Sequence, residues 1–331
     1  MKKQIPFNIS SLFRSHSDAE FEQLCINTFH HQYQNIEVYK AFVDALNINI
    51  ENINSLQSIP FMPIEFFKTF DILKNESSYD AVFMSSGTTG MQRSRHFIKD
   101  INVYKESFMA AFKIFYGDIK SYTVLALLPS YVENGDSSLV FMADHLIKES
   151  GNTDSGFYLD DYKLLINKLK DLQFTNKKVL LLGVSYALLD LIEIQKFSFP
   201  SLIIMETGGM KGRRKELVRE DLHKQLCAGF GVSKIHSEYG MTELLSQAYS
   251  SSDGVFTYPP WMKILIRDVN DPLAYMDHGK SGAINIIDLA NIHSVSFLAT
   301  KDLGKLLNKQ NFTILGRFDN SDIRGCNLLV V

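Results

Sequence analysis

Apolar residues recur at helical spacing over the first eighty residues of the chain. Two such stripes are Phe21, Leu24, Cys25 and Phe29, and then Tyr39, Phe42, Val43 and Leu46. Steps of three and four residues place the members of each stripe on one face of a helix, which can then pack against a core. The pattern therefore predicts a helical N-terminal lobe over residues 1–80.

Beyond residue 80, short apolar runs of strand length alternate with helical patterns. The runs cover residues 81–84, 123–128, 179–182, 202–205 and 284–287. Most of them end in a cluster of Gly, Ser or Pro, as strands of α/β proteins commonly do. We therefore expect an α/β core over residues 81–315, followed by a C-terminal tail over residues 316–331.

Composition and charge exclude several classes of protein. The chain has 331 residues, of which 45% are hydrophobic, so it can bury a large core. With 34 basic and 37 acidic side chains it has no cationic field, and we expect no nucleic-acid partner. The most apolar segment, from Val179 to Ile194, is short and includes Asp190 and Glu193, so we read it as a buried strand and helix and expect no membrane span.

The cysteines and the N-terminal sequence indicate the cellular compartment of the protein. Cys25, Cys227 and Cys326 are odd in number, far apart and without a CxxC pair, which argues against a disulfide framework or a zinc site. No apolar signal sequence follows the opening lysines, because Pro6 interrupts the start. We therefore expect a cytoplasmic protein, with Cys25 and Cys227 in its core.

A loop rich in hydroxyl groups and glycine directly follows the apolar run at 81–84. It consists of Ser85, Ser86, Gly87, Thr88, Thr89 and Gly90. Glycines let successive N–H groups point inward and the hydroxyls add donors, which suits a polyphosphate. No lysine follows Gly90, so the standard nucleotide-triphosphatase loop is excluded, although Arg93 and Arg95 could supply positive charge. A polar surface turn accounts for the loop equally well.

A second cluster contains Tyr239, Thr242 and Glu243 and follows another apolar stretch. The tyrosine ring could lie against a planar base, the threonine could bond a phosphate oxygen, and the glutamate could hold Mg²⁺. The alternative is a helix start capped by the threonine. His236, just before this cluster, is the histidine of most interest.

Three further segments contain polar groups suited to a nucleotide. Asp302 in residues 300–304 could accept both ribose hydroxyls, and Arg317 in residues 316–319 could pair with phosphate or ribose. Both segments could instead be turns. Gly208 and Gly209 follow an apolar run, and the basic residues after them could reach a phosphate or form a solvated helix start. These basic residues are Lys211, Arg213 and Arg214.

In this order, the motifs resemble those of the adenylate-forming acyl-activating superfamily. Segments such as SSGTTGMQRSR, SEYGMTELLSQAY and GRFDNSDIRGCNLL are similar to one branch of it, the acyl-protein synthetases of bacterial bioluminescence, which are long-chain-fatty-acid ligases. The likeness extends from near residue 55 to residue 331. It implies the large-domain fold of these enzymes, with the helical lobe before it and without their usual C-terminal lid domain.

The resemblance also implies an activity and its residues. With ATP and Mg²⁺, a fatty or other carboxylic acid would become an acyl adenylate, then a thioester on the protein's own cysteine, for delivery to an acyl or fatty-acid reductase partner. The implied roles are Thr88 and Thr89 at the phosphates, Tyr239 and the Gly208–Gly209 pair at adenine, Thr242 at the α-phosphate, Glu243 at the metal, Asp302 at ribose, and Arg317 at ribose or phosphate.

Cys326 stands where this branch has its acylated cysteine. Arg324 beside it would favour the thiolate. Cys326 could instead be a small apolar residue packed in a terminal strand. The protein as a whole could instead be a ligase that transfers the acyl group to coenzyme A or a carrier protein, or a non-catalytic nucleotide-binding subunit of a reductase complex. Because the lid domain supplies a lysine that assists adenylation, its absence leaves the catalytic cation unassigned.

Overall fold

A computed structural model gives the fold of the chain. It describes residues 5–73, 78–86, 92–128, 136–208, 214 and 217–318. The helices are α1 (Asp18–Asn35), α2 (Glu37–Ala45), α3 (Phe66–Thr69), α4 (Ile101–Tyr116), α5 (Ser138–Ser150), α6 (Tyr162–Leu172), α7 (Ser185–Ile194) and α8 (Arg219–Phe230). The strands are β1 (Met62–Pro63), β2 (Ala81–Met84), β3 (Arg95–Ile98), β4 (Tyr122–Leu127), β5 (Gly156–Phe157), β6 (Lys178–Val184), β7 (Ile203–Thr207), β8 (His236–Tyr239), β9 (Ala248–Ser250), β10 (Val255–Thr257), β11 (Met262–Arg267), β12 (Ser281–Asp288), β13 (Phe297–Leu306) and β14 (Asn311–Arg317).

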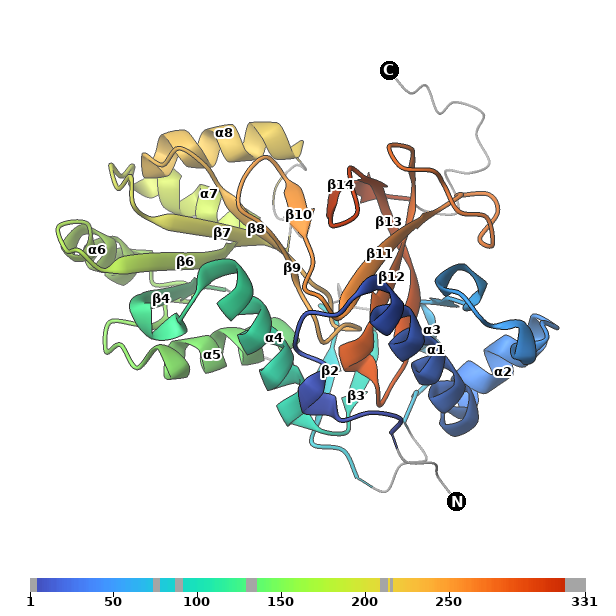
Figure 1. Cartoon of the computed structure of the whole chain (residues 1–331). Coiled ribbons are helices and arrows are strands. Elements are labelled where there is room, and N and C mark those ends of the chain that lie inside the picture. Colours follow the sequence, from blue (N-terminus) through green and yellow to red (C-terminus); the bar gives the residue numbers. More distant parts are fainter. Residues whose placement is uncertain are drawn as a thin grey trace.

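One mixed sheet contains every strand except β2 and β3. Its order is β11-β12-β13-β14-β10-β9-β8-β7-β6-β4-β5, with β1 added beside β13. Strands β4 to β8 pair in parallel, whereas β8 to β14 pair antiparallel in their part of the sheet. Helices α7 and α8 cover one face of the parallel part, and α4 and α5 cover the other (Figure 1). Strand β4 is therefore buried along its whole length, as parallel strands generally are.

The N-terminal helices pack beside the antiparallel part of the sheet (Figure 1). The buried amide of Gln32 on α1 donates to the carbonyl oxygen of Asn291 at 2.9 Å and accepts from the backbone N–H of Ser296 at 3.0 Å. Further along, β1 runs parallel to β13, with Met62 opposite Leu298. The start of the chain is thus hydrogen-bonded to a segment that comes near its end.

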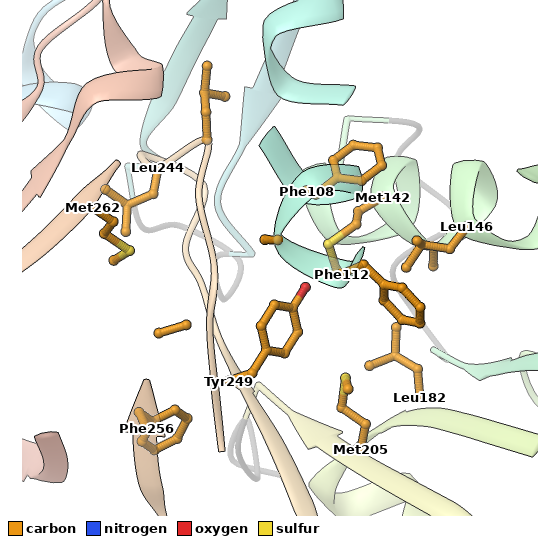
Figure 2. Packing of buried hydrophobic residues seen from close by; sticks show 14 of the residues in the cluster. Phe108, Phe112, Met142, Leu146, Leu182, Met205, Leu244, Tyr249, Phe256 and Met262 are labelled. Carbon is orange, nitrogen blue, oxygen red and sulfur yellow. The ribbon is translucent and has the colours of Figure 1, made fainter. Parts of the chain in front are cut away.

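The apolar core is continuous between the helices and the sheet. Figure 2 shows the ring of Tyr249, from β9, directed towards Phe108 and Phe112 of α4 and Met142 of α5. All four side chains are buried. No helix among the described residues is long and apolar enough to cross a membrane.

The fold confirms the α/β class, and each of the five apolar runs contributes to a strand. The strand and helix expected between Val179 and Ile194 are β6 and α7. Cys25 is buried as expected, and Cys227 on α8 is half-buried and packs against the edge of the core. The domain limits at residues 80 and 315 stay predictions.

Two of the alternatives from the sequence are wrong. Asp302 and Arg317 lie within β13 and β14 rather than in turns, because these segments pair with each other in register. No helix begins at Thr242, and the next regular element is β9, so the threonine is not a helix cap.

Candidate active site

One cavity of about 380 Å³ is lined by residues from both the parallel and the antiparallel parts of the sheet. Every predicted site residue that the structure describes lies in its wall: Ser85, Ser86, Gly208, Tyr239, Thr242, Glu243, Asp302 and Arg317. Gly87, Thr88, Thr89, Gly90, Gly209 and Cys326 lie outside the described residues, as do Lys211 and Arg213. The structure therefore brings residues that are more than two hundred positions apart to one place.

Tyr239 and Arg317, at the ends of β8 and β14, form a connected group with Asp302 in the middle of β13. The Tyr239 hydroxyl donates to Oδ2 of Asp302 at 2.6 Å, and Nε of Arg317 lies 3.2 Å from Oδ1 of the same carboxylate. Burial raises the pKa of Asp302, while these two partners oppose the shift. The Arg317 side chain is 75% exposed, so it can reach a ligand at the mouth of the cavity.

The backbone at Thr242 is held by His96 of β3. Nδ1 of His96 lies 2.9 Å from the Thr242 carbonyl oxygen, and Nε2 lies 2.9 Å from the Ser294 hydroxyl. Because a carbonyl oxygen only accepts, Nδ1 has the proton and Nε2 accepts from the serine. Burial lowers the pKa of His96 to about 4, so the ring is neutral near pH 7. His96 is a positioning residue for Thr242.

Glu243 presents a buried carboxylate to the cavity. Asn291 donates to its carbonyl oxygen at 2.8 Å, which fixes its backbone. Burial raises the pKa of the carboxyl, and the Ser94 hydroxyl and the cations of Lys68 and Arg317 oppose that shift. The Ser94 hydroxyl is buried in the cavity wall beside this carboxylate.

These groups suit a divalent cation that is shared with a phosphate-bearing ligand. Within the described ranges, no cluster of three or more His, Cys, Asp or Glu side chains could hold a metal on its own. Mg²⁺ needs few protein ligands when phosphate oxygens and water supply the rest. Glu243 with the Ser94 hydroxyl beside it fits such a shared site.

Asp288 anchors the segment that follows Glu243. Its Oδ2 accepts from the backbone N–H groups of Leu245 and Ser246 at 2.8 and 2.9 Å. Its Oδ1 accepts from the Ser246 hydroxyl at 2.6 Å and from the backbone of Ala290 at 3.0 Å. This fully buried carboxyl holds the chain between Glu243 and Gln247 in place.

The loop at Ser85 begins at the β2–β3 ribbon. The backbones of Ser85 and Ser94 are joined at 3.0 Å, and the Ser85 hydroxyl accepts from Ser94 N–H at 2.9 Å. Arg93 pairs with Asp136 at 3.1 Å and Arg95 with Asp71 at 2.7 Å. Both arginines therefore already have carboxylate partners and lie outside the cavity wall.

Three other candidates have different surroundings. Gly208 has φ +74°, a conformation that a side chain rarely adopts, and it lines the cavity. Arg214 pairs with Asp190 and Glu193. His236 lies outside the cavity wall with Nδ1 3.2 Å from the Tyr116 hydroxyl, and burial lowers its pKa to about 4.

The cavity also contains residues that the sequence did not single out. They are chiefly Lys68, Tyr104, Met142, Glu238 and Gln247. Glu238 offered the clearest signal. It directly precedes Tyr239 in a stretch that reads as a buried strand, and an acidic residue is rarely buried there without a functional reason. Lys68 gave none, since a lysine among helix formers normally lies in water.

Comparison with known proteins places this geometry in context. No protein-family model matches the chain. Over 72 residues, the chain is 31% identical to a long-chain-fatty-acid–luciferin-component ligase of Photorhabdus luminescens. The matched segment is 22% of this chain and 61% of that relative. The resemblance inferred from the motifs is thereby confirmed.

Solved structures agree on the fold. A 2-hydroxyisobutyryl-CoA ligase in complex with 2-HIB-AMP and CoA aligns over 94% of this chain and 71% of its own, with a TM-score of 0.69 and 13% identity. ATP-bound MatB from Rhodopseudomonas palustris aligns over 72% of this chain and 48% of its own, with a TM-score of 0.52 and 19% identity. The chain thus has the fold of these adenylate-forming ligases and spans about half of the MatB chain.

Proposed function

We propose that this protein activates a carboxylic acid with ATP, as an acyl adenylate, and transfers the acyl group to a thiol. The observation that supports this most is the convergence of Ser85, Gly208, Tyr239, Thr242 and Asp302 on one cavity, from segments far apart in sequence. The names of the similar proteins agree with it, because they include a fatty-acid ligase and a CoA ligase bound to an acyl-AMP. Since the chain matches only part of these relatives, the whole activity is our proposal.

Different residues of the cavity would contact the adenine, the ribose and the phosphates of ATP. Tyr239 offers a ring for the adenine, and the Asp302 carboxylate, which Tyr239 and Arg317 already orient, would accept the ribose hydroxyls. The Thr242 hydroxyl and the hydroxyls from Ser85 onward would donate to phosphate oxygens. Glu243 would hold Mg²⁺, which neutralises phosphate charge when bound.

In the first step, a carboxylate oxygen of the acid attacks the α-phosphorus of ATP, and the bond to pyrophosphate breaks. Negative charge builds on the phosphate oxygens, so donors fixed in advance lower the barrier. His96 and Asn291 hold the backbone of Thr242 and Glu243 for this purpose. In the second step a thiolate sulfur attacks the acyl carbon and AMP leaves.

Lys68 is the cation that we propose for the phosphate chain. It lies in the cavity wall, its charge lowers the pKa of Glu243, and it makes no ion pair with a residue that the structure describes. By contrast, Lys301 in the same wall pairs with Glu65 at 2.8 Å. We therefore assign the stabilisation of departing pyrophosphate to Lys68.

For the acyl acceptor we propose Cys326, followed by delivery to an acyl reductase. A thioester retains much of the reactivity of the adenylate and survives transfer between proteins. This role requires a free thiol, which agrees with a reducing cytoplasmic location. Coenzyme A or a carrier protein is the alternative acceptor, as in the CoA ligases of the same fold.

Pyrophosphate release from ATP, Mg²⁺ and a panel of carboxylic acids tests the activity. Asp302→Ala should lower kcat/KM at least tenfold, because a charged hydrogen bond contributes about 1.5–3 kcal/mol. Asp154→Asn is a matched control, since this carboxylate pairs with Lys168 and Lys177 away from the cavity. Binding of ATP without pyrophosphate release for any acid would instead favour a non-catalytic subunit.

A further inference from the structure

Two buried side chains in the cavity wall each have an acceptor oxygen to which no described residue donates, and for Gln247 that oxygen is itself buried. Glu238 is 9% exposed, and Thr207 donates to its Oε2 at 2.5 Å, but no described residue donates to its Oε1. Gln247 is 3% exposed, and its Oε1 is buried without a hydrogen-bond partner. A buried acceptor left unpaired typically costs about 1–3 kcal/mol, so such groups usually meet a ligand or water.

Glu238 and Gln247 are neighbours on either side of Gly240. A Cβ atom at Gly240 would collide with Oε1 of Glu238 and would lie 3.2 Å from Cγ of Gln247. The lack of a side chain at this position therefore leaves room for both groups. We call Glu238 Oε1 and Gln247 Oε1 the acceptor pair.

This pair faces away from Tyr239. Side chains alternate along a strand, so Glu238 and Tyr239 point to opposite faces of β8. Glu238 lies opposite Tyr249 in the β8–β9 register, and Figure 2 shows Tyr249 directed towards α4 and α5. Tyr104 of α4 and Met142 of α5 line the cavity on that side. The nucleotide ring assigned to Tyr239 and the acceptor pair therefore occupy different parts of the cavity.

The part of the cavity beside α4 and α5 is where the substituent of the activated acid would lie. Its carboxylate must reach the α-phosphate near Thr242, and the Tyr239 side is taken by the nucleotide. The apolar walls at Tyr104 and Met142 suit a hydrocarbon portion. Burial and the neighbouring Glu206 raise the pKa of Glu238 to about 7, so the protonated and ionised forms are both populated near neutral pH, and a donor in the ligand would favour the ionised form that accepts it.

We infer that the acid activated at this site has a hydrogen-bond donor, a hydroxyl or amino group, in its acyl portion, and that Glu238 and Gln247 receive that donor. This inference rests on the proposed function and names its substrate class. Glu238 and Gln247 are then specificity-determining residues. A site built for a donor rejects an analogue without it more strongly than an apolar pocket rejects a changed chain length.

The test compares matched acids in the pyrophosphate assay with the full-length protein. Butanoic, hexanoic and octanoic acids are each assayed beside their hydroxy- and amino-substituted counterparts. We expect kcat/KM for the best donor-bearing acid to exceed that of the plain acid by about 100-fold or more. Glu238→Leu should remove this preference, and Glu238→Gln should reduce it for amino acids more than for hydroxy acids.

Asp154→Asn is the control, because this carboxylate pairs with Lys168 and Lys177 and lies outside the cavity wall. It should leave the preference unchanged. Equal activity of the wild type on plain and substituted acids would overturn the inference and leave the proposed function standing. Absence of pyrophosphate with every acid would overturn both.

Discussion

Glu238→Gln should alter the pH dependence of folding stability in a way that can be calculated from its burial. The pKa of this carboxyl is raised from 4.5 to about 7, chiefly by burial and then by Glu206, while the Thr207 hydroxyl opposes the shift. Below pH 4.5 both the folded and the unfolded chain hold the proton. As the pH rises to 7 the unfolded chain releases it first, so the folded state loses stability.

The size of this loss follows from the shift. A difference of about 2.5 pKa units corresponds to about 3 kcal/mol, fully lost above pH 7. Glutamine is close in shape to the protonated acid and does not titrate. We therefore expect the variant, relative to the wild type, to be about 2–3 kcal/mol more stabilised at pH 8 than at pH 5.

Urea unfolding of both proteins at several pH values measures this difference. Contributions from His96, His236 and other titrating groups cancel, because both proteins contain them. Asp154→Asn is the control: Lys168 and Lys177 lower the pKa of Asp154 to about 2, so this carboxyl is almost fully ionised in both the folded and the unfolded chain between pH 5 and 8, and its effect should be flat. A flat difference for Glu238→Gln as well would refute the idea that this carboxyl is held protonated by its surroundings.

Three other outcomes are expected. Glu243→Gln and Lys68→Met should each lower kcat/KM for ATP by about 10- to 100-fold, measured by pyrophosphate release, and unchanged kinetics would exclude the assigned metal and phosphate roles. Cys326→Ser should still release pyrophosphate in a first turnover but show no acyl mass increment by intact-mass measurement after incubation with ATP and acid. An increment that persists in the variant would place the thioester elsewhere. Asp288→Ala should lower the free energy of unfolding by about 3 kcal/mol in urea titrations, because it leaves buried N–H groups unpaired, and a loss below about 1 kcal/mol would contradict the anchoring role.

Much of the fold could be predicted from the sequence because local patterns determine it. The run at 179–182 is entirely apolar, as a strand covered on both faces must be, and it became β6. The pairing of β1 with β13 could not be predicted, since Met62 and Pro63 form too short a segment to show any period. Long-range register depends on packing that a single sequence does not display.

Some residues of the candidate site could likewise be predicted from the sequence, and others could not. Tyr239, Thr242 and Asp302 were found because their motifs are compact and occur in a fixed order. Glu238 and Gln247 were missed because their meaning depends on which face of β8 and β9 they occupy, and on the absence of a side chain at Gly240. A residue of this kind shows its role only when the strands are paired.

The bonds between Gln32 and residues near 291–296 also bear on how the protein is made. The two partners are 259 to 264 positions apart, so the first long helix emerges from the ribosome well before the backbone that satisfies it. At about 5–20 residues per second, the delay is roughly 13 to 53 seconds. During that interval the amide of Gln32 has no native partner and α1 can make only local contacts, such as that between Phe29 and Tyr39 of α2, so the N-terminal helices must wait exposed for the sheet surface that later covers them.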